Sequence, residues 1–162
     1  MMTLIADATL APKSASLPQL CTMRSIVSED TEALGRLYYD AYDPGEACAT
    51  VEEAIADMQA TFRGEYGTLW LAASSVIERE KELVAAILVV HRAPWEDTPD
   101  CPFIIELFTS RSFRQQGLAR ALLCHCFLLT SMTERPCLAL RVIATNEAAT
   151  RLYTSLGFHL WP

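Results

Sequence analysis

The chain has 162 residues, of which 51% are hydrophobic and 20% are charged. This composition excludes a disordered or fibrous protein, and the length suits one globular domain with its own core. The formal net charge of -7 argues against a nucleic-acid-binding protein, because such a protein needs a basic face.

The N-terminal residues 1–19 are expected to form a flexible extension ahead of a single domain at residues 20–162. This extension has no charged start followed by a sustained apolar stretch, so no export signal is expected. No apolar run reaches the roughly 18 to 20 residues that a membrane-spanning helix needs. The six cysteines are expected to be reduced thiols, which places the protein in the cytoplasm.

Apolar periodicity predicts the elements in the first part of the domain. Ser28 followed by acidic residues is typical of a helix start, and the charged residues 78–82 are expected to join two strands as an antiparallel hairpin. In chain order, the predicted elements are a strand at 20–26, helices at 28–41 and 50–62, and strands at 69–76 and 83–91.

The second part of the domain is expected to form a βαβ unit after a Pro-rich, acidic linker. The order strand, helix, strand predicts two parallel neighbours with a right-handed crossover. The predicted elements are a strand at 103–109, a helix at 116–131, a strand at 137–143 and a last helix at 146–155. The fold class is therefore α/β, with a mixed central sheet and helices on both faces.

Positive charge gathers in the last third of the chain. Residues 1–106 hold 18 acidic and 7 basic side chains, a balance of -11, whereas residues 107–162 hold 2 acidic and 6 basic ones, a balance of +4. The sequence RQQGLA at residues 114–119 follows a predicted strand and opens a predicted helix. Free N–H groups and the helix dipole attract an anion there, and Gly117 lets a phosphate approach closely. Taken alone, an ordinary glycine near a helix start explains this segment equally well.

Two segments of the chain resemble the GNAT superfamily of acetyl-CoA-dependent N-acetyltransferases: FIIELFTSRSFRQQGLARALL and LALRVIATNEAATRLYTSLGF. The first contains the pyrophosphate motif R/Q-x-x-G-x-G/A, and the second contains V-x-x-x-N-x-x-A-x-x-L-Y-x-x-x-G-F. The resemblance implies a GNAT-like sheet in which two parallel strands splay apart at a CoA cleft. It also implies an enzyme that moves an acetyl group from acetyl-CoA to a primary amine of a small molecule or a protein.

The resemblance implies contacts with acetyl-CoA along the first motif and at the start of the last helix. The N–H groups of residues 115–120 would hold the pyrophosphate, and main-chain groups of the preceding strand would pair with the pantetheine arm. The expected cofactor-binding residues are Leu107, Thr109, Arg114, Gln115, Gln116, Gly117, Leu118, Ala119, Arg120 and Asn146.

The resemblance also implies two catalytic side chains. Tyr153 would donate a proton to the leaving thiolate, since a phenol with a pKa of about 10 is protonated at pH 7. Glu106 would accept the proton of the amine, through water or with a pKa raised by burial. Alternatively, Tyr153 is a core aromatic residue and Glu106 faces solvent on the far side of the sheet.

Strand alternation divides the residues around Glu106 into two faces. Ile105 and Leu107 are expected on one face, and Ile104, Glu106 and Phe108 on the other. The sequence does not say which face lines the cleft.

The sequence Cys124-His125-Cys126 contains metal-ligating residue types, but no metal site is expected. Adjacent residues on a helix diverge by about 100 degrees and cannot chelate one ion. These side chains are expected in the core.

The amine acceptor is expected to approach an acidic group of residues in the predicted helical pair, which borders the acceptor side in the family. Such a group favours a cationic amine, such as a polyamine, an aminoglycoside or a lysine side chain. A solvated helix face explains the same residues. The acidic group consists of Asp40, Asp43, Glu46, Glu52, Glu53 and Asp57.

The sequence departs from the family pattern at its end, because it stops at Pro162 where family members continue through two more strands that wall the acceptor site. The N-terminal extension or a second subunit is expected to supply this wall. An exposed sheet edge there would favour a homodimer. The alternative function is an acyl-CoA-binding sensor or partner protein with weak or no turnover.

Overall fold

The computed structural model describes residues 1–162, and its strands form a single sheet. The strands are β1 (Met2–Asp7), β2 (Cys21–Ser25), β3 (Ser75–Arg79), β4 (Glu82–Val90), β5 (Phe103–Thr109), β6 (Cys137–Val142) and β7 (His159–Leu160). Their order across the sheet is β2-β3-β4-β5-β6-β1-β7. All neighbours are antiparallel except β5 and β6, which run parallel. The expected mixed sheet is therefore confirmed.

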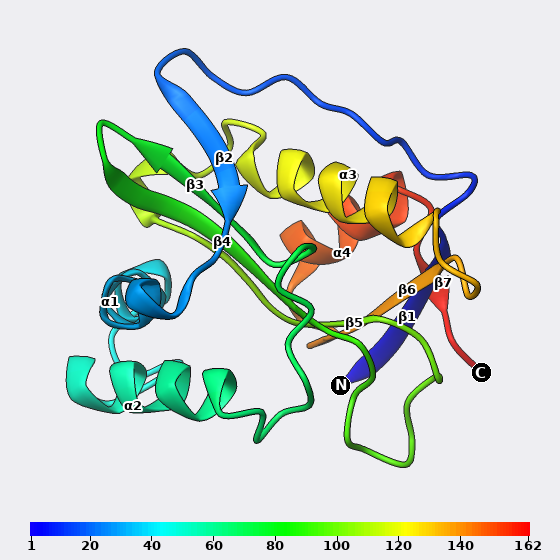
Figure 1. Ribbon diagram of the computed structural model, residues 1–162, viewed down its shortest axis with the longest axis horizontal. Coiled ribbons are helices and arrows are strands. Elements are labelled where there is room, and N and C mark those ends of the chain that lie inside the picture. The colour runs from blue at the N-terminus through cyan, green and yellow to red at the C-terminus, as the bar shows by residue number, and fades with distance from the viewer.

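Helices cover both faces of this sheet, as expected (Figure 1). The helices are α1 (Thr31–Ala41), α2 (Val51–Phe62), α3 (Leu118–Thr130) and α4 (Glu147–Ser155). Leu34 of α1 and Met58 of α2 are buried in one cluster with Leu88 of β4. Leu122 of α3 and Leu156, just after α4, are buried in a second cluster on the opposite face. None of the helices has the length and apolar character needed to cross a membrane.

The expected antiparallel β3–β4 hairpin is present, and β4 lies close to its predicted range of 83–91, but β3 begins later in the chain than predicted. Its strands are joined at Glu80 and Lys81, whose positive φ angles of 51° and 70° form a tight two-residue turn. The charged residues expected in the connection extend β3 as far as Arg79 instead. The predicted strand at 69–76 is wrong over most of its length, because the continuous ladder begins only at Ser75.

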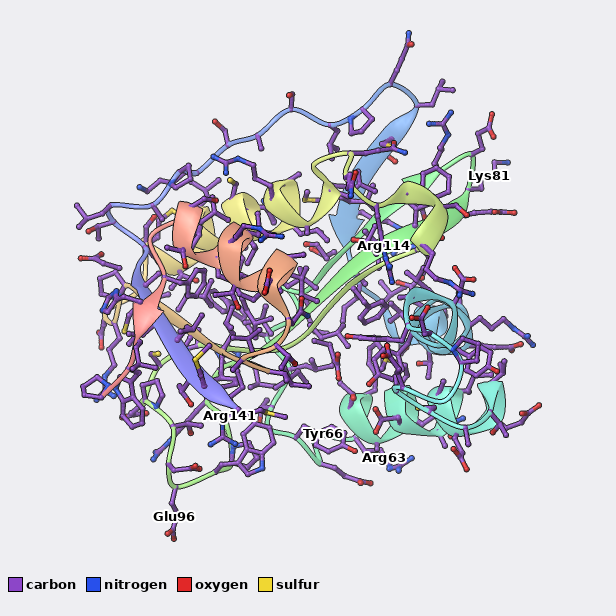
Figure 2. All side chains as sticks on the ribbon, turned by 180° about the vertical axis from the view of Figure 1, so that it is seen from behind. Arg63, Tyr66, Lys81, Glu96, Arg114 and Arg141 are labelled. Carbon is purple, nitrogen blue, oxygen red and sulfur yellow. The ribbon has the colours of Figure 1, made fainter.

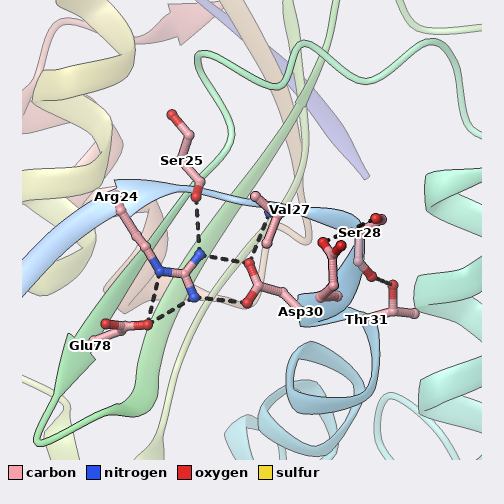
Figure 3. Close-up of polar contacts among 8 residues, drawn as sticks. Arg24, Ser25, Val27, Ser28, Asp30, Thr31 and Glu78 are labelled. Carbon is pink, nitrogen blue, oxygen red and sulfur yellow. Dashed lines mark hydrogen bonds and ion pairs between the residues drawn. The ribbon is translucent and has the colours of Figure 1, made fainter.

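Arg24 on β2 ties the start of α1 to the sheet (Figure 3). Its guanidinium donates to both carboxylate oxygens of Asp30, each at 2.8 Å, and to Glu78 of β3 at 2.9 Å. The hydrogen bonds from Arg24 lower the pKa of the buried Asp30 carboxyl group. Asp30 also accepts a hydrogen bond from the Val27 N–H at 2.9 Å. Ser28 therefore does not cap the helix with its side chain, contrary to the sequence pattern.

The N-terminal residues form a strand inside the sheet. β1 pairs antiparallel with β6 along its whole length and with β7 on its other side. Leu4, Ala6 and Ala8 point alternately into the core. The expected flexible extension is wrong for β1, because this apolar alternation completes the edge that β6 would otherwise expose. Residues 8–20 contain no helix or strand and pass along α3 to reach β2 (Figure 1).

Leu4→Ala is expected to destabilise the protein by about 2 to 5 kcal/mol, because the truncation leaves a cavity where β1 meets the core. Leu4 is 5% exposed, whereas Leu10 in the following loop is 85% exposed. Leu10→Ala is the matched control and should change the free energy of unfolding by less than about 0.5 kcal/mol. Urea unfolding measures both, and equally small effects would mean that β1 is not docked in solution.

Candidate functional site

A gap opens between the parallel strands β5 and β6. They pair only at Phe103–Ala139 and Ile104–Leu140, although both strands continue further. Beyond these pairs, the main-chain groups on the β6-facing edge of β5 have no ladder partner. The separation that the sequence resemblance implied is therefore present.

A β-bulge in β5 sets the direction of Glu106. Leu88 of β4 pairs with Glu106, and the next residue, Val89, pairs with Ile104. Ile105 is therefore an extra residue in β5. Because Leu88 belongs to the cluster beneath α1 and α2, its partner Glu106 faces the same two helices.

The bulge also breaks the expected alternation along β5. Ile104 and Leu107 both pack in the cluster beneath α3 and α4, whereas Ile105 and Phe108 pack beneath α1 and α2. The predicted grouping of Ile104 with Glu106 on one face is therefore wrong. Strict period-two alternation fails wherever a strand contains an extra residue.

Glu106 is a half-buried carboxyl group without an ionic partner. Burial and the nearby Asp57 carboxylate raise the pKa of Glu106 to about 8, while the Tyr38 hydroxyl lowers it. None of the protein's ion pairs includes Glu106. About one such group in ten is ionised at pH 7. This carboxylate is a stronger base than an ordinary glutamate and ionises close to neutral pH.

Tyrosine side chains lie around this carboxyl group. The ring of Tyr38 on α1 packs edge-on against both Tyr42 and Phe108, with 5.3 Å between ring centroids in each pair. Burial, and after it Glu106, raises the pKa values of Tyr38 and Tyr42. Neither tyrosine is among the site residues predicted from the sequence. Their four-residue spacing, which favours one face of a helix, is the signal that would have paired them.

Asp57 of α2 is the member of the predicted acidic group that lies beside Glu106. Its Oδ1 accepts a hydrogen bond from the Tyr66 hydroxyl at 2.6 Å. The nearest arginine in the sequence, Arg63, pairs with Glu65 instead, at 2.8 Å. Figure 2 shows Tyr66 and Arg63 near the end of α2. Neither Asp57 nor Glu106 forms an ion pair with a basic side chain, so the negative charge of Asp57, and that of Glu106 when it is ionised, is not neutralised by the protein.

Asp57→Asn is expected to lower the pKa of Glu106, because it removes a negative charge that opposes ionisation of that carboxyl group. An NMR titration of the Glu106 side-chain carboxyl carbon measures this pKa. Asp43→Asn is the control, because the Asp43 carboxylate pairs with Arg111. A midpoint that stays at about 8 in Asp57→Asn would mean that burial alone sets the pKa.

Tyr153 of α4 combines a core position with a free hydroxyl group. Its side chain is 8% exposed, and its ring packs against Phe158 with 5.6 Å between ring centroids. The Tyr153 hydroxyl forms no hydrogen bond within the protein. The only side-chain polar atom that is both fully buried and without a hydrogen-bond partner is Ser75 Oγ, so the Tyr153 hydroxyl is not fully buried. The phenol oxygen therefore keeps access to solvent. Burial and then Glu106 raise the pKa of Tyr153 to about 12, so the two predicted catalytic groups interact electrostatically.

The start of α3 presents a row of free backbone N–H groups. None of the N–H groups from Gln115 to Arg120 donates to another group of the protein, and no side chain caps the helix. Gly117 has a φ of 78°, which glycine adopts without strain, and a Cβ placed on it would meet nothing within 4 Å. The first turn of α3 contains no acidic residue. This arrangement fits a phosphate group.

Two of the three arginines near this helix start are engaged elsewhere. Arg114 donates a hydrogen bond to a main-chain carbonyl at the end of α1 (Figure 2). Arg111 pairs with Asp40 at 3.8 Å and with Asp43 at 3.6 Å. Arg114 thus anchors the loop to α1. Arg120, in the first turn of α3, is exposed, and its side chain forms neither a hydrogen bond nor an ion pair.

The other predicted contacts lie along the same gap. Asn146 caps α4, because its Oδ1 accepts a hydrogen bond from the Ala149 N–H at 3.2 Å. Its amide nitrogen has no partner and remains available as a donor. Leu107 and Thr109 lie on β5 beyond its last pair with β6, where the strand edge is open.

The sequence matches the family model described as acetyltransferase (GNAT) family over residues 27–158. No curated protein sequence gives a significant match.

Solved structures share the fold at low sequence identity. A GCN5-related N-acetyltransferase from Sphaerobacter thermophilus has a TM-score of 0.74 and 20% identity, with coverage of 99% of this chain and 48% of that chain. This chain thus spans about half the length of that protein. The ribosomal-protein-S18-alanine N-acetyltransferase from Escherichia coli has a TM-score of 0.56 and 23% identity, with coverage of 85% and 76%. AAC(6')-Iy, in complex with a CoA-containing bisubstrate analog, has a TM-score of 0.62 and 17% identity, with coverage of 86% and 90%.

Proposed function

This chain belongs to the acetyltransferase (GNAT) family, and we propose that it transfers an acetyl group from acetyl-CoA to a primary amine of a small molecule or a protein. The observation that carries the proposal is the row of free N–H groups at the start of α3, next to the open edge of β5. The pyrophosphate of an acyl-CoA would accept hydrogen bonds from these N–H groups, and its amide-containing arm would pair with the open edge of β5.

The residues of the chain fit acetyl-CoA. The N–H groups of residues 115–120 would bind the pyrophosphate, and the side chain of Arg120 would add positive charge. Main-chain groups of Leu107 and Thr109 would pair with the pantetheine amides as an added strand does. The free amide nitrogen of Asn146 is a further donor. When bound, acetyl-CoA supplies an activated acetyl group as a thioester.

Glu106 and Tyr153 would handle the two protons of the reaction. An alkylamine with a pKa of about 10.4 is almost entirely ammonium at pH 7.5, with about one molecule in a thousand free. Glu106, with its pKa raised to about 8, would accept the proton of that ammonium group. Tyr153, with a pKa of about 12, keeps its proton at neutral pH and can donate it to a departing thiolate.

Acetyl-CoA is expected to stabilise the folded protein by about 2.7 kcal/mol at a hundredfold excess over its dissociation constant. Gly117→Val should abolish the resulting rise in melting temperature, because the branched side chain would occupy the open space beside the N–H groups. Gly45→Val is the matched control, since Gly45 also has a positive φ, of 83°, and open space around its Cβ position. No shift in the wild type, or equal shifts in both variants, would contradict the proposed cofactor site.

A release assay for free thiol, run against a panel of amines, tests turnover. Asp57 and Glu106 favour a cationic acceptor, so polyamines, aminoglycosides and lysine-containing peptides belong in the panel. Stabilisation by acetyl-CoA without thiol release for any amine would contradict the proposed enzyme and support an acyl-CoA-binding sensor.

A further inference from the structure

Two cysteines lie opposite each other at the base of the gap between β5 and β6. Cys101 lies two residues before Phe103, and Cys137 lies two residues before Ala139, the partner of Phe103 in the parallel pairing. Cys101 thus lies just before the first residue of β5, and Cys137 is the first residue of β6, so the parallel pairing brings both to the same end of the two strands. Cys137 accordingly packs against the small buried cluster that contains Cys101, Phe103 and Ala139.

The two segments are held together on both sides of these cysteines. Before them, Arg135 donates to the main-chain carbonyl of Asp100 at 2.8 Å and forms an ion pair with its carboxylate. After them, the Ala139 N–H donates to the Pro102 carbonyl at 3.0 Å. Neighbouring strands lie about 4.8 Å apart. This spacing is within the range of about 4.4 to 6.8 Å between the Cα atoms of a disulfide.

The two thiols differ in their access to solvent. Cys101 is 2% exposed, and burial followed by the neighbouring Cys137 raises its pKa to about 12. Cys137 is half-buried and lines an open cavity of about 240 Å³ together with Pro136 and His159. A small reagent can therefore reach Cys137 first. The nearby Arg135 guanidinium partly opposes this rise in the pKa of Cys101.

We propose that Cys101 and Cys137 form a redox-active pair that a low-molecular-weight disulfide converts into an intrachain disulfide. The Cys137 thiolate attacks one sulfur of the small disulfide, which forms a mixed disulfide and releases one small thiolate. Cys101 then gives up its proton and attacks the Cys137 sulfur, which forms the Cys101–Cys137 bond and releases the second small thiolate. The protein loses two electrons and two protons, and the small disulfide is reduced to two thiols.

The other four cysteines offer no comparable pair. Cys124 and Cys126 are two positions apart on α3, so their side chains diverge. Cys21 begins β2, which is at the far edge of the sheet from β6, and Cys48 lies in the connection between α1 and α2. A disulfide between Cys101 and Cys137 would join β5 to β6 just below the point where the two strands separate.

The experiment treats the full chain with oxidised glutathione and maps the disulfides by mass spectrometry. Cleavage after glutamate separates the two cysteines, because residues 97–106 contain only Cys101 and residues 135–147 contain only Cys137. The expected product is a cross-link between these two peptides, with a mass lower by two hydrogen atoms and reversed by dithiothreitol. The oxidised protein should also melt at a higher temperature, since the cross-link restricts the unfolded chain.

Cys137→Ser should prevent the cross-link, whereas Cys48→Ser, at another half-buried cysteine, should leave it unchanged. A stable glutathione adduct on Cys137, a cross-link to a different cysteine, or no reaction in the wild type would each overturn the proposal. The wild-type map decides the matter even if a variant fails to fold. The readout is covalent and does not depend on acetyl transfer.

Discussion

Glu106→Gln is expected to lower kcat for acetyl transfer by about 10²- to 10⁴-fold, the contribution typical of a general base. Glutamine keeps the size and hydrogen-bonding capacity of the side chain but cannot take up the proton of an ammonium group. The folded protein favours the neutral form of Glu106, because burial raises its pKa. Glutamine imitates that neutral form, so the melting temperature should be maintained.

The pH dependence of the wild type supplies a second measurement. Glu106 ionises as the pH rises through about 8, so kcat/KM should increase up to that pH. In Glu106→Gln this increase should be absent, and kcat/KM should rise with pH only as the amine substrate loses its proton. The raised pKa of Glu106 also affects stability. The contribution of Glu106 to the free energy of unfolding is fully present below about pH 4.3, the pKa of glutamate in the unfolded chain, and it is lost as the pH rises through about 8, its pKa in the folded protein. An unchanged rate and pH profile in Glu106→Gln would assign the proton to another group.

The elements of the domain were predictable because their signals are local. Helical spacing in α1 and α2 and the strand, helix, strand order of β5, α3 and β6 do not depend on distant residues. β1 was missed because its six residues pair with β6, at the other end of the chain. Nothing in a short apolar segment specifies so distant a partner, and the following residues with Pro12 and Pro18 resemble a loose tail.

The site was predictable in part for the same reason. Gly117 and the residues around it form a local motif, and their N–H groups are free as expected. The direction of Glu106 was not predictable, because it depends on one extra residue at Ile105 that only the pairing with β4 shows. The partner of Arg114 likewise comes from the end of α1, far away in the sequence.

Tyr153→Phe is expected to lower kcat by at least about a hundredfold with little change in the KM for acetyl-CoA. The substitution removes only a hydroxyl group that has no partner in the protein, so the ring should continue to pack against Phe158. Its pKa of about 12 keeps the phenol protonated across the working pH range. Tyr39→Phe is the control, since Tyr39 is a half-buried tyrosine of α1 to which no role is assigned.

The identity of the leaving group tests the same role from the substrate side. A thiolate of ordinary basicity benefits from a proton as the carbon–sulfur bond breaks, whereas an aromatic thiolate is stable without one. The loss of rate caused by Tyr153→Phe should therefore be smaller with an acetyl thioester of an aromatic thiol than with acetyl-CoA. An equal loss for both donors would mean that the phenol positions the substrates. Wild-type turnover, or melting many degrees below the wild type, would instead assign Tyr153 to the core alone.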